Sequence, residues 1–357
     1  MTASDARFMA LALSLGRRGL GRVWPNPAVG CVIVRDGRIV GRGRTADGGR
    51  PHAEVVALAQ AGAAAQGATA YVTLEPCAHH GQTGPCAEAL VTAGIARVVV
   101  ATGDPNPLVA GKGLAMLRAA GVTVETGLGE AQARADHAGF LRVQTDGRPF
   151  LTLKLATTLD GRIATGCGDS KWITGPQARR QVHAMRARHD AVLVGAGTLR
   201  ADDPGLDVRG LGDVPQPVRV VMASRAELPD DGQLARAARA GAPVWVLHGE
   251  GTPPWGETLR CDLSGGRIDP ASALRALAGR GITRVFCEGG GQVAASLLAA
   301  GLVDELVLFQ GGKVVGAEGL PALGVLPRSL MRDAPALRLI SQDRIGDDVM
   351  QRWQPLD

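Results

Sequence analysis

The pattern of apolar positions over the first 130 residues alternates between helical and strand spacing. Apolar residues recur at intervals of three and four from Phe8 to Leu15, which predicts an amphipathic helix over residues 4–16 with Ser4 as its N-cap. Short runs rich in Val and Ile then predict strands, with helices and turn residues between them. We expect strands at 28–35, 38–44, 69–74, 97–102 and 122–126, and helices at 52–61, 86–93 and 112–120. Such an alternation predicts an α/β fold in which helices cover the faces of a sheet.

The second half of the chain has its own succession of strands and helices. A helix and a linker are expected over 130–149, and Asp146-Gly147-Arg148-Pro149 is typical of a boundary. We therefore predict two domains, residues 1–146 and 147–357, which suits the length of 357 residues. In the second domain we expect strands at 150–156, 191–195, 218–223, 244–248, 285–287, 303–309 and 337–342, and helices that begin near Pro176 and at Gln292.

Lys154 is an unusual residue in the first strand of the second domain. Leu151, Leu153 and Leu155 share one face of that strand, and Lys154 lies on the other. A lysine in mid-strand, with the polar turn 159–162 after it, favours a cation that faces a cleft. An exposed residue on an edge strand is the simpler interpretation of Lys154 taken alone.

A glycine-rich turn joins a strand to a helix near residue 290. The strand 283–287 is followed by Glu288-Gly289-Gly290-Gly291 and then by a helix over 292–300. This order lets backbone N–H groups at a helix N-terminus approach a pyrophosphate. The turn lacks the G-x-G-x-x-G pattern, and three glycines in a row are also typical of an ordinary tight turn.

Composition and charge narrow the class of protein. The 39 basic and 34 acidic residues give a net charge of +5 without a run of five like charges, which is typical of a solvated surface and compatible with phosphorylated ligands. Aromatic residues make up 3% of the chain, too few for base-stacking platforms, so we expect no nucleic-acid partner.

Membrane and export signals are also missing from the sequence. There is no apolar run of about 18 residues, so we expect no membrane span. The N-terminus lacks the pattern of a signal peptide, and the 6 cysteines are scattered, so we expect a reducing, cytoplasmic location.

His52, Cys77 and Cys86 carry the strongest chemical signal. One imidazole and two thiolates are good ligands for Zn²⁺, and three protein ligands leave the fourth tetrahedral position open to water. Glu54 lies two residues after His52, where a carboxylate can take a proton from zinc-bound water and give it to a leaving amine. This H-x-E … P-C … C arrangement is the zinc-deaminase signature.

The spacing of the two cysteines differs from the short zinc-deaminase pattern. Eight residues, 78–85, separate Cys77 from Cys86, whereas C-x-x-C is usual. The polar, Gly-rich insert is expected to form a loop that also touches substrate. Two cysteines that only pack in a core are the alternative, but a histidine and a neighbouring Glu54 in a motif of their own argue against it.

Two rigid polar loops are candidates for completing the first site. In Pro25-Asn26-Pro27 the prolines force extended backbone around Asn26, just before a strand. The loop 103–107 follows a strand at its carboxyl end, where α/β proteins usually bind ligands. Their amide and carboxylate groups suit a pyrimidine edge, and a plain turn or connector is the alternative in each case.

Taken together, these motifs resemble those of the bifunctional riboflavin-biosynthesis deaminase/reductase family. The long spacing between Cys77 and Cys86 is normal in this family, and the motifs occur in the family's order over nearly the whole chain. The matching segments in the first half are Pro25-Asn26-Pro27, His52-Ala53-Glu54, Glu75-Pro76-Cys77 to Gly81, Pro85-Cys86, and Asp104-Pro105-Asn106-Pro107 to Gly113. Those in the second half are Leu153-Lys154-Leu155, residues 159–162, Trp172-Ile173-Thr174, residues 201–204, and Glu288-Gly289-Gly290.

The resemblance implies a fold for each domain and two consecutive reactions. The first domain would be a cytidine-deaminase-like three-layer α/β/α domain, and the second a dihydrofolate-reductase-like α/β domain. Zn²⁺-dependent hydrolytic deamination of 2,5-diamino-6-ribosylamino-pyrimidinone 5′-phosphate would come first. NADPH-dependent reduction of the ribosyl side chain would follow and give 5-amino-6-ribitylamino-uracil 5′-phosphate. The resemblance also implies a small phosphorylated pyrimidine as ligand and a homo-oligomer.

Carried over residue by residue, the resemblance implies a site for each reaction. His52, Cys77 and Cys86 would hold zinc, and Glu54 would move the protons. Lys154 would lie beside the carbon that is reduced, as a group that orients substrate or supplies a proton. The implied substrate contacts are Asn26, His79 and Asn106 in the first site, and Ser170, Arg186, Leu206, Arg209 and Glu288 in the second.

A second set of residues would bind NADPH. These are Ala156, Trp172, Thr174, Thr198, Asp202 and Ser224, with Gly290, Gly291, Gln292, Val293, Ala294, Ala295 and Ser296 of the glycine turn. Arg186 and Arg209 suit the substrate phosphate by charge and fork geometry. Arg225, beside Ser224 at the end of a strand, is a candidate for the 2′-phosphate of NADPH.

Two other functions are compatible with parts of the sequence. A zinc deaminase of another pyrimidine, a nucleoside or RNA would share the first motif, with an unrelated C-terminal half, but the low aromatic content argues against RNA. A non-catalytic C-terminal binding domain is the other alternative, because the motifs of that half are weaker one by one. Loss of Glu54 or of a ligand would signal a non-catalytic first domain, and all four residues are present.

Overall fold

The computed structural model describes residues 2–80, 84–106, 109–326 and 330–356, so Gly81 and Pro107 of the sequence motifs lie outside the described residues. The chain divides into two compact units, Met1–Gly147 and Arg148–Asp357. Each unit has its own main sheet, and each packs apolar residues on that sheet.

The first unit is built on a five-stranded sheet of order β2-β1-β3-β4-β5. β1 runs antiparallel to β2 and β3, whereas β3, β4 and β5 are parallel. Asp36 and Gly37 both have positive φ in the turn between β1 and β2, as their Asp-Gly sequence predicts. The elements are α1 (Ala3–Arg17), β1 (Gly30–Arg35), β2 (Arg38–Arg44), η1 (Asp47–Gly49), α2 (Ala53–Ala61), η2 (Gly62–Ala65), β3 (Thr69–Val72), α3 (Cys86–Thr92), β4 (Arg97–Val100), α4 (Lys112–Ala119), β5 (Thr123–Thr126) and α5 (Glu130–Asp146).

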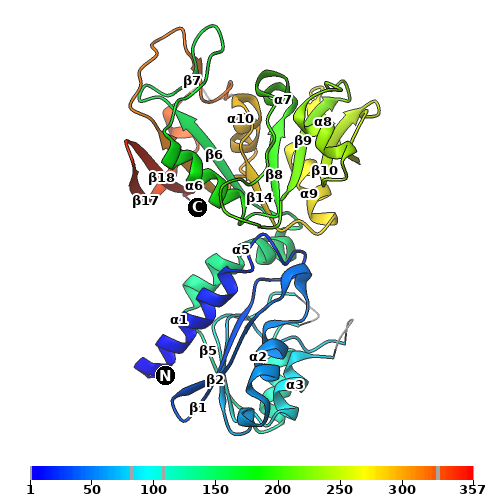
Figure 1. Ribbon diagram of the computed structural model, residues 1–357, viewed down its shortest axis with the longest axis vertical. Helices are drawn as coiled ribbons and strands as arrows, with labels where there is room; N and C mark the ends of the chain where they lie inside the picture. Colours follow the sequence, from blue (N-terminus) through cyan, green and yellow to red (C-terminus); the bar gives the residue numbers. More distant parts are fainter. Residues whose placement is uncertain (1, 81–83, 107–108, 327–329, 357) are drawn as a thin grey trace. The chain divides into compact units, whose positions relative to one another are not determined.

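Helices cover both faces of this sheet. Strand residues such as Val32 and Val99 point to one face, where they pack with residues of α1 and α5. Their neighbours Ile33 and Val98 point to the other face and pack with α2, α3 and α4. In Figure 1, α1 and α5 lie side by side, and α2 and α3 lie across the sheet from them. The predicted layering, a sheet between two layers of helices, is confirmed for this unit.

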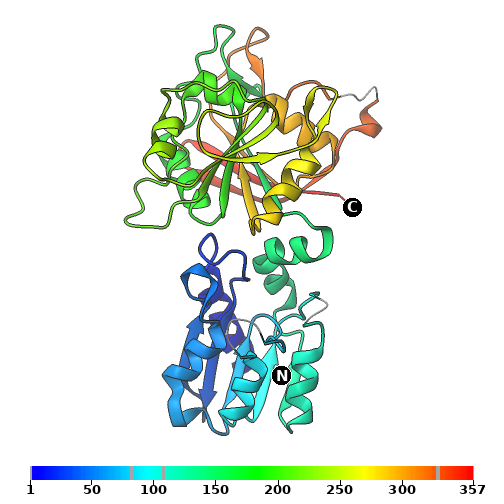
Figure 2. The same cartoon turned by 90° about the vertical axis from the view of Figure 1, so that its right-hand side faces the viewer.

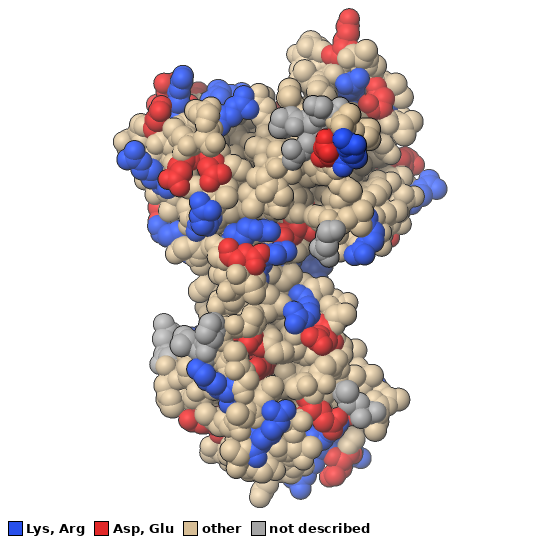
Figure 3. Space-filling view, turned by 180° about the vertical axis from the view of Figure 1, so that it is seen from behind, with Lys and Arg blue, Asp and Glu red and all other residues tan. Residues whose placement is uncertain are grey.

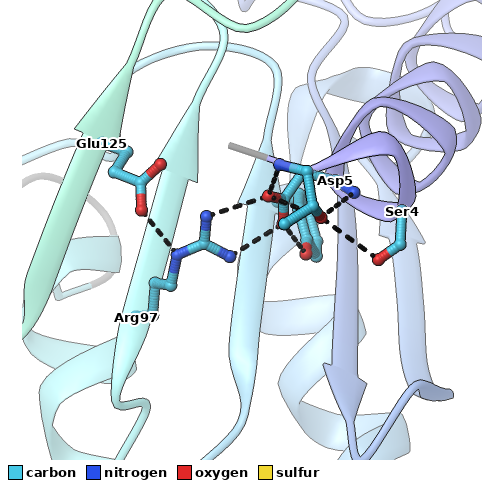
Figure 4. Close-up of polar contacts among 6 residues, drawn as sticks. Ser4, Asp5, Arg97 and Glu125 are labelled. Atoms are coloured by element: carbon cyan, nitrogen blue, oxygen red, sulfur yellow. Dashed lines mark hydrogen bonds and ion pairs between the residues drawn. The ribbon is translucent and has the colours of Figure 1, made fainter.

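A buried carboxylate fastens α1 to the sheet. Asp5 accepts a hydrogen bond from Tyr71 Oη at 2.6 Å and two from the guanidinium of Arg97 at 2.8 and 3.2 Å. Glu125 accepts from Arg97 Nε at 2.8 Å, so one arginine joins two strands and a helix (Figure 4). The hydrogen bond from Arg97 holds the pKa of Asp5 well below its usual range. Burial of Tyr71 and, to a smaller extent, its hydrogen bond to Asp5 raise the pKa of Tyr71 to about 12.

The start of α1 differs from the prediction. Thr2, and not Ser4, is the N-cap, because the side chain of Thr2 accepts the N–H of Asp5 and the carboxylate of Asp5 accepts the N–H of Thr2. Such a reciprocal capping box satisfies two of the free N–H groups of a helix end. The sequence contains this signal in Thr2-x-x-Asp5, with Asp in place of the usual Glu or Gln.

The second unit is built on a nine-stranded sheet of order β11-β10-β9-β8-β14-β6-β15-β18-β17. The strands from β11 to β15 are parallel, and β18 pairs antiparallel with β15 and β17. The helices are α6 (Pro176–Arg186), α7 (Ala196–Asp202), α8 (Gln233–Arg239), α9 (Pro270–Gly279), α10 (Gly291–Ala299) and η3 (Met331–Asp333). The strands are β6 (Phe150–Thr157), β7 (Arg162–Ala164), β8 (Ala191–Gly195), β9 (Val218–Arg225), β10 (Val244–Glu250), β11 (Glu257–Arg260), β12 (Leu263–Ser264), β13 (Arg267–Ile268), β14 (Arg284–Cys287), β15 (Glu305–Gln310), β16 (Leu320–Pro321), β17 (Leu337–Ile345) and β18 (Asp348–Pro355).

Helices lie on both faces of this sheet as well. Val182 of α6 and Leu234 of α8 pack with Val194 and Phe286 on one face. α9 and α10 lie on the opposite face, as the right-handed crossovers between parallel strands require (Figures 1 and 2). β6 pairs with β14 on one side and β15 on the other, so Lys154 lies on a central strand. The interpretation of Lys154 as an exposed edge residue is therefore wrong.

Several elements of the second unit were not predicted. α7 takes in Thr198 and Asp202, which we expected in a polar loop over 197–204, because a short helix with few apolar residues leaves no periodic pattern. β18 was not predicted, because polar residues such as Gln351 and Arg352 interrupt the alternation of apolar and polar residues that is typical of a strand. β18 is fixed by its pairing with β15, about 40 residues earlier in the chain, which local sequence does not reveal.

Charged side chains are spread over the surface. Lys and Arg are interspersed with Asp and Glu over the face drawn in Figure 3, in line with the absence of charge runs in the sequence. In the part of the chain that the structure describes, no helix has both the length and the apolar character needed to cross a bilayer.

Candidate active sites

The first candidate site gathers His52, Cys77 and Cys86 at the N-terminal ends of two helices. Cys86 is the first residue of α3. His52 is the N-cap of α2, which begins at Ala53, one position after the predicted start at His52, because the backbone of His52 is still extended. His52 Nδ1 lies 3.3 Å from Cys86 Sγ and 3.7 Å from Cys77 Sγ. The three ligand atoms lie within 4.8 Å of one another. One nitrogen and two sulfurs at this spacing fit a tetrahedral Zn²⁺ ion.

The hydrogen bonds of this cluster already favour a cation. A bond from the thiol of Cys86, with others from His52 and from the N–H of Cys86, lowers the pKa of Cys77 to about 4. The bond to Cys77, together with burial, raises the pKa of Cys86. A thiolate is the form of cysteine that binds a metal ion, so the lowered pKa of Cys77 suits a divalent cation at this cluster.

The ring of His52 presents one nitrogen to the sulfurs. Nδ1 faces Cys77 and Cys86, whereas the buried Nε2 has no hydrogen-bond partner among the described residues. The hydrogen bond to Cys77 raises the pKa of His52, burial opposes the shift, and the charge of Arg50 opposes it further. The geometry assigns Nδ1 as the ligand atom.

Glu54 lies in the first turn of α2, beside the cluster. Its side chain is buried, and burial raises its pKa to about 7. A carboxyl group whose pKa lies near neutrality can both accept and donate a proton at physiological pH. This is the property that the sequence-based role of Glu54 requires.

A cavity of about 160 Å³ opens beside the cluster. Its lining includes Glu54 and all three predicted substrate contacts of this site, Asn26, His79 and Asn106. The N–H of Asn26 donates to the carbonyl of Val23, which fixes the turn that presents its amide. The other lining residues besides His52 and Cys77 are Pro27, Val29, Thr45, Arg50, Leu74, Glu75, Asp104, Val109 and Phe140. Five apolar residues among many polar and charged ones suit a ring with several hydrogen-bonding groups on its edge.

Two carboxylates of this cavity were given no individual role by the sequence. Glu75 accepts N–H bonds from Gly111 at 3.1 Å and Gly113 at 3.1 Å, so it holds the loop after β4 and the start of α4 against the segment that carries Cys77. Asp104 accepts the N–H of Asn106 at 2.8 Å, and burial raises its pKa to about 6. The position of Glu75 directly before Pro76-Cys77 was the available signal for its positioning role.

The second candidate site centres on three largely buried charges. Arg186 Nε and Nη2 donate to the two carboxylate oxygens of Glu288 at 2.5 and 3.1 Å. Lys154 Nζ lies 4.0 Å from Glu288 Oε2, and these side chains are between 10% and 16% exposed. Burial lowers the pKa of Lys154. Burial opposes ionisation of Glu288 too, but the charges of Arg186 and Lys154 lower its pKa overall.

The guanidinium of Arg186 is committed to these contacts. Besides its fork on Glu288, its Nη1 donates to the carbonyl of Asp207 at 2.7 Å. Arg209 is exposed and lies 3.5 Å from Asp207 Oδ1, and buried Leu206 adopts a positive φ of 54° in the same loop. The structure therefore brings four of the five predicted substrate contacts to this region and leaves Arg209 as the more accessible cation. Ser170 lies apart in sequence, in the segment before α6, where it is partly exposed.

The glycine turn between β14 and α10 has the predicted order of strand, glycines and helix N-terminus. A Cβ atom at Gly289 would lie 2.7 Å from the backbone of Gly195, and one at Gly290, whose φ is 44°, would lie 3.0 Å from Thr198 Oγ1. The missing side chains let the turn pack closely on Gly195 and Thr198, directly before the N-terminus of α10, and a helix N-terminus can bind a phosphate. Ala294 and Ala295 are buried, and the N–H of Ala294 donates to the carbonyl of Gly290 at 3.1 Å within the helix.

The other predicted NADPH contacts lie at several places in the second unit. Trp172 is 58% exposed, and the guanidinium of Arg179 stacks 4.4 Å from its ring centre. Ser224 Oγ accepts the N–H of Ile268 at 3.2 Å, so this hydroxyl has a structural bond of its own. Arg225 lines a separate open cavity with Glu227 and Glu250, whose carboxylates oppose a phosphate there.

The remaining three of these residues lie on β6, near α6 and on α7. Ala156 is in β6, two residues after Lys154. Thr174 precedes α6, and its carbonyl accepts from Arg179 Nη1 at 2.6 Å. Asp202 is the last residue of α7, where it is exposed.

Two family models match the two units of the chain. Residues 149–350 match the family described as the RibD C-terminal domain. Residues 2–102 match the cytidine and deoxycytidylate deaminase zinc-binding region.

Proteins similar over the full length carry both parts. The riboflavin biosynthesis protein RibD of Escherichia coli (strain K12) is 42% identical over 97% of this chain and 98% of its own. That of Haemophilus influenzae is 42% identical over 99% of this chain and 98% of its own. Among solved structures, Acinetobacter baumannii RibD (form 1) has a TM-score of 0.89 and 38% identity, and it covers 99% of each chain. A diaminohydroxyphosphoribosylaminopyrimidine deaminase/5-amino-6-(5-phosphoribosylamino)uracil reductase from Thermotoga maritima has a TM-score of 0.89 and 37% identity, again over 99% of each chain.

Proposed function

Because this chain belongs to the RibD family, the bifunctional deaminases and reductases of riboflavin biosynthesis, we propose that its two candidate sites carry one activity each. The predicted bifunctional activity is confirmed, as is the fold class, a cytidine-deaminase-like domain followed by a dihydrofolate-reductase-like domain. The predicted cofactors, Zn²⁺ and NADPH, are confirmed as well. The boundary that we propose between the two activities is the predicted one, with residues 1–146 for deamination and 147–357 for reduction.

The proposed substrate of the first site is 2,5-diamino-6-ribosylamino-pyrimidinone 5′-phosphate, in line with the name of the Thermotoga maritima relative. His52, Cys77 and Cys86 would hold Zn²⁺, which supplies an activated water when bound. Glu54 takes a proton from that water and passes it to the departing 2-amino group, because its raised pKa allows both steps. The bond between ring carbon C2 and the nitrogen of the 2-amino group breaks, a C–O bond forms at the same carbon, and ammonia leaves.

The polar lining of the cavity orients the pyrimidine. Asn26, His79 and Asn106 reach the same cavity from three separate segments, which supports their role in reading the ring edge. Glu75 holds the loop of Asn106 in place through its bonds to Gly111 and Gly113. The observation that carries the proposal is the meeting of three zinc-type ligand atoms and the buried Glu54 at one end of this cavity.

For the second reaction we propose that Lys154, Glu288 and Arg186 organise the ribosyl group. NADPH supplies the hydride for the open-chain C1′ when bound. Lys154 has three N–H donors, and its nearest carboxylate oxygen, Glu288 Oε2, lies 4.0 Å away, so it is suited to orient the substrate and to supply the proton. Arg186 keeps Glu288 ionised and in place. Leu206, Arg209 and Ser170 complete the proposed substrate contacts.

We propose that NADPH binds along the glycine turn and the carboxyl ends of the neighbouring strands. Gly290, Gly291, Gln292 and Val293 would hold the pyrophosphate through the backbone N–H groups at the start of α10, and Ala294, Ala295 and Ser296 would line the site farther along this helix. Thr198 Oγ1 lies beside Gly290, which supports its contact with the same group. Ala156, Trp172, Thr174, Asp202 and Ser224 would line the rest of the cofactor site.

A coupled assay with metal analysis tests both halves. The purified protein receives the diaminopyrimidinone substrate with and without NADPH, while ammonia release and loss of NADPH absorbance are followed. Ammonia without NADPH, followed by matching NADPH oxidation, supports the proposal and its order of steps. Ammonia without any NADPH oxidation would point to the alternative of a non-catalytic C-terminal domain. A zinc-loaded protein that releases no ammonia would overturn the proposed substrate.

Three expectations from the sequence stay predictions. The homo-oligomer is tested by light scattering, and the cytoplasmic location by cell fractionation. The absence of a nucleic-acid partner is tested by a binding assay with single-stranded RNA and DNA at low salt, where non-specific binding would be strongest.

A further inference from the structure

The charges around the deaminase cavity are unevenly distributed. Three carboxyl groups, those of Glu54, Glu75 and Asp104, line it, and Arg50 is the single Lys or Arg among its described lining residues. A phosphorylated substrate brings about two negative charges at neutral pH. Repulsion from the carboxylates makes the side of the cavity near Arg50 the favourable place for those charges.

The backbone around Arg50 is held between two parts of the site. The N–H of Ala46 donates to the carbonyl of Pro51 at 3.0 Å, which closes the loop that carries Arg50. Gly49, with a φ of 89°, packs so closely on Asn26 that a Cβ atom there would lie within 2.8 Å of the Val23 carbonyl and closer still to the Asn26 amide. Arg50 is therefore fixed between a predicted pyrimidine contact and the zinc ligand His52, and its side chain is partly buried.

The size of the cavity separates the ring from the phosphate. An apolar cavity of about 150 Å³ holds a benzene ring, and this cavity measures about 160 Å³. Once the pyrimidine ring lies against the zinc-type cluster, the ribosyl phosphate must lie toward the opening. Arg50 lines the cavity and is partly exposed, and a guanidinium can bind a phosphate through two parallel hydrogen bonds.

We propose that Arg50 binds the 5′-phosphate of the substrate in the deaminase site and so selects the phosphorylated pyrimidine over its dephosphorylated form. The inference rests on the proposed function and adds a residue to which neither the sequence motifs nor the zinc-type cluster gave a role. Arg50 acts on the part of the substrate that does not react, so it governs affinity and leaves the chemical step to Glu54.

Deamination of the phosphorylated and the dephosphorylated substrate by matched variants tests this role. Arg50→Gln should raise the KM for the phosphorylated substrate about 10- to 100-fold, the loss of a charge-assisted contact, with kcat within about twofold. Its KM for the dephosphorylated substrate should be that of the wild type. Arg50→Lys should recover part of the discrimination. Arg44→Gln is the control, because Arg44 binds the Thr45 carbonyl and Asp47 and is not among the lining residues, and it should behave as the wild type.

Binding without turnover gives an independent measurement. In zinc-loaded Glu54→Gln protein, calorimetry should show tighter binding of the phosphorylated form, and adding Arg50→Gln should remove that preference. Equal losses for both substrates, or an unchanged KM for the phosphorylated one, would overturn the proposal. Failure of the proposed function would look different: the wild type would release no ammonia from either substrate, while the calorimetric preference would still decide the role of Arg50.

Discussion

The two sites of this chain are built in different ways. The zinc-type site takes its ligands from 35 consecutive residues, 52–86, and places two of them at helix N-termini where the backbone is already fixed. The reductase site joins Lys154, Arg186 and Glu288, which span 134 residues from first to last. They come together because β6, which carries Lys154, pairs with β14, which ends directly before Glu288. A site made of local segments can be recognised from spacing alone, whereas a site made by strand pairing needs the fold.

The largest expected effect separates the two sites by chemistry. Glu54→Ala should lower the rate of deamination by about 10²–10⁴-fold, because no other group takes over its proton transfers. The protein should still bind about one zinc per chain, and it should reduce the preformed deaminated intermediate at the wild-type rate. Ammonia release followed alongside metal analysis gives both quantities, and unchanged deaminase turnover would exclude the assigned role.

The converse change should affect only the second site. Lys154→Ala should lower the rate of reduction by about 10²-fold, through loss of an orienting and proton-supplying group. Deamination should be unaffected, and Lys171→Ala, which removes an exposed lysine of the same unit, should reduce normally. NADPH oxidation is the measurement, and equal loss of both activities by Lys154→Ala would indicate misfolding instead.

Stability offers a third way to compare the units. Asp5→Asn breaks the buried pair with Arg97 and should lower the free energy of unfolding of the first unit by about 3 kcal/mol. The more exposed partner Glu125 provides the control, since Glu125→Gln should have a smaller effect. Calorimetry of the full chain measures the transition temperatures, and similar shifts for both variants would count against the anchoring role of Asp5.

Mild acid should weaken the second unit first. Burial lowers the pKa of His189 to about 3, below its ordinary value near 6.5. The unfolded chain therefore binds the extra proton first, so this part of the stability is present above pH 6.5 and is lost as the pH falls toward 3. At pH 5 the loss is about 2 kcal/mol. Asp5, whose pKa is depressed, starts to lose its contribution only below about pH 4.

Unfolding followed by tryptophan fluorescence measures this difference. Trp245 and Trp255 are buried in the second unit and report on it. His189→Gln should flatten the dependence of the second unit's stability on pH between 7 and 5. An equally steep dependence in the variant would assign the acid sensitivity to another group.

Much of the first site was predictable because its signals are local. Ligand type, spacing and the helix starts that follow Pro51 and Pro85 identified the cluster from the sequence. The role of Glu75 was not predicted, since its partners Gly111 and Gly113 are reached only after a strand and a long loop. Arg50 belongs to no motif. Only the cavity shows that it is the single Lys or Arg among the described lining residues, which include three carboxyl groups.

In the second unit the sequence predicted where single strands lie better than it predicted which strands pair with one another. It gave β8 with the observed bounds, but it could not tell whether Lys154 lay at an edge or in the middle of the sheet, because that depends on which strands pair with β6. It also suggested that the fork of Arg186 faces a phosphate, while the structure shows that fork on Glu288. Residue spacing does not show whether an arginine binds a ligand or a neighbouring carboxylate.

The two units are joined in one chain at Gly147 and Arg148, and this covalent link determines how much of each unit the cell makes. One translation event yields one copy of each unit, so the ratio of deaminase to reductase stays at one to one whatever the level of expression. The deaminated intermediate released by the first step thus always has as many reductase sites as there are deaminase sites that made it. Fusion of the two units in one chain fixes the balance of two consecutive reactions without any regulator.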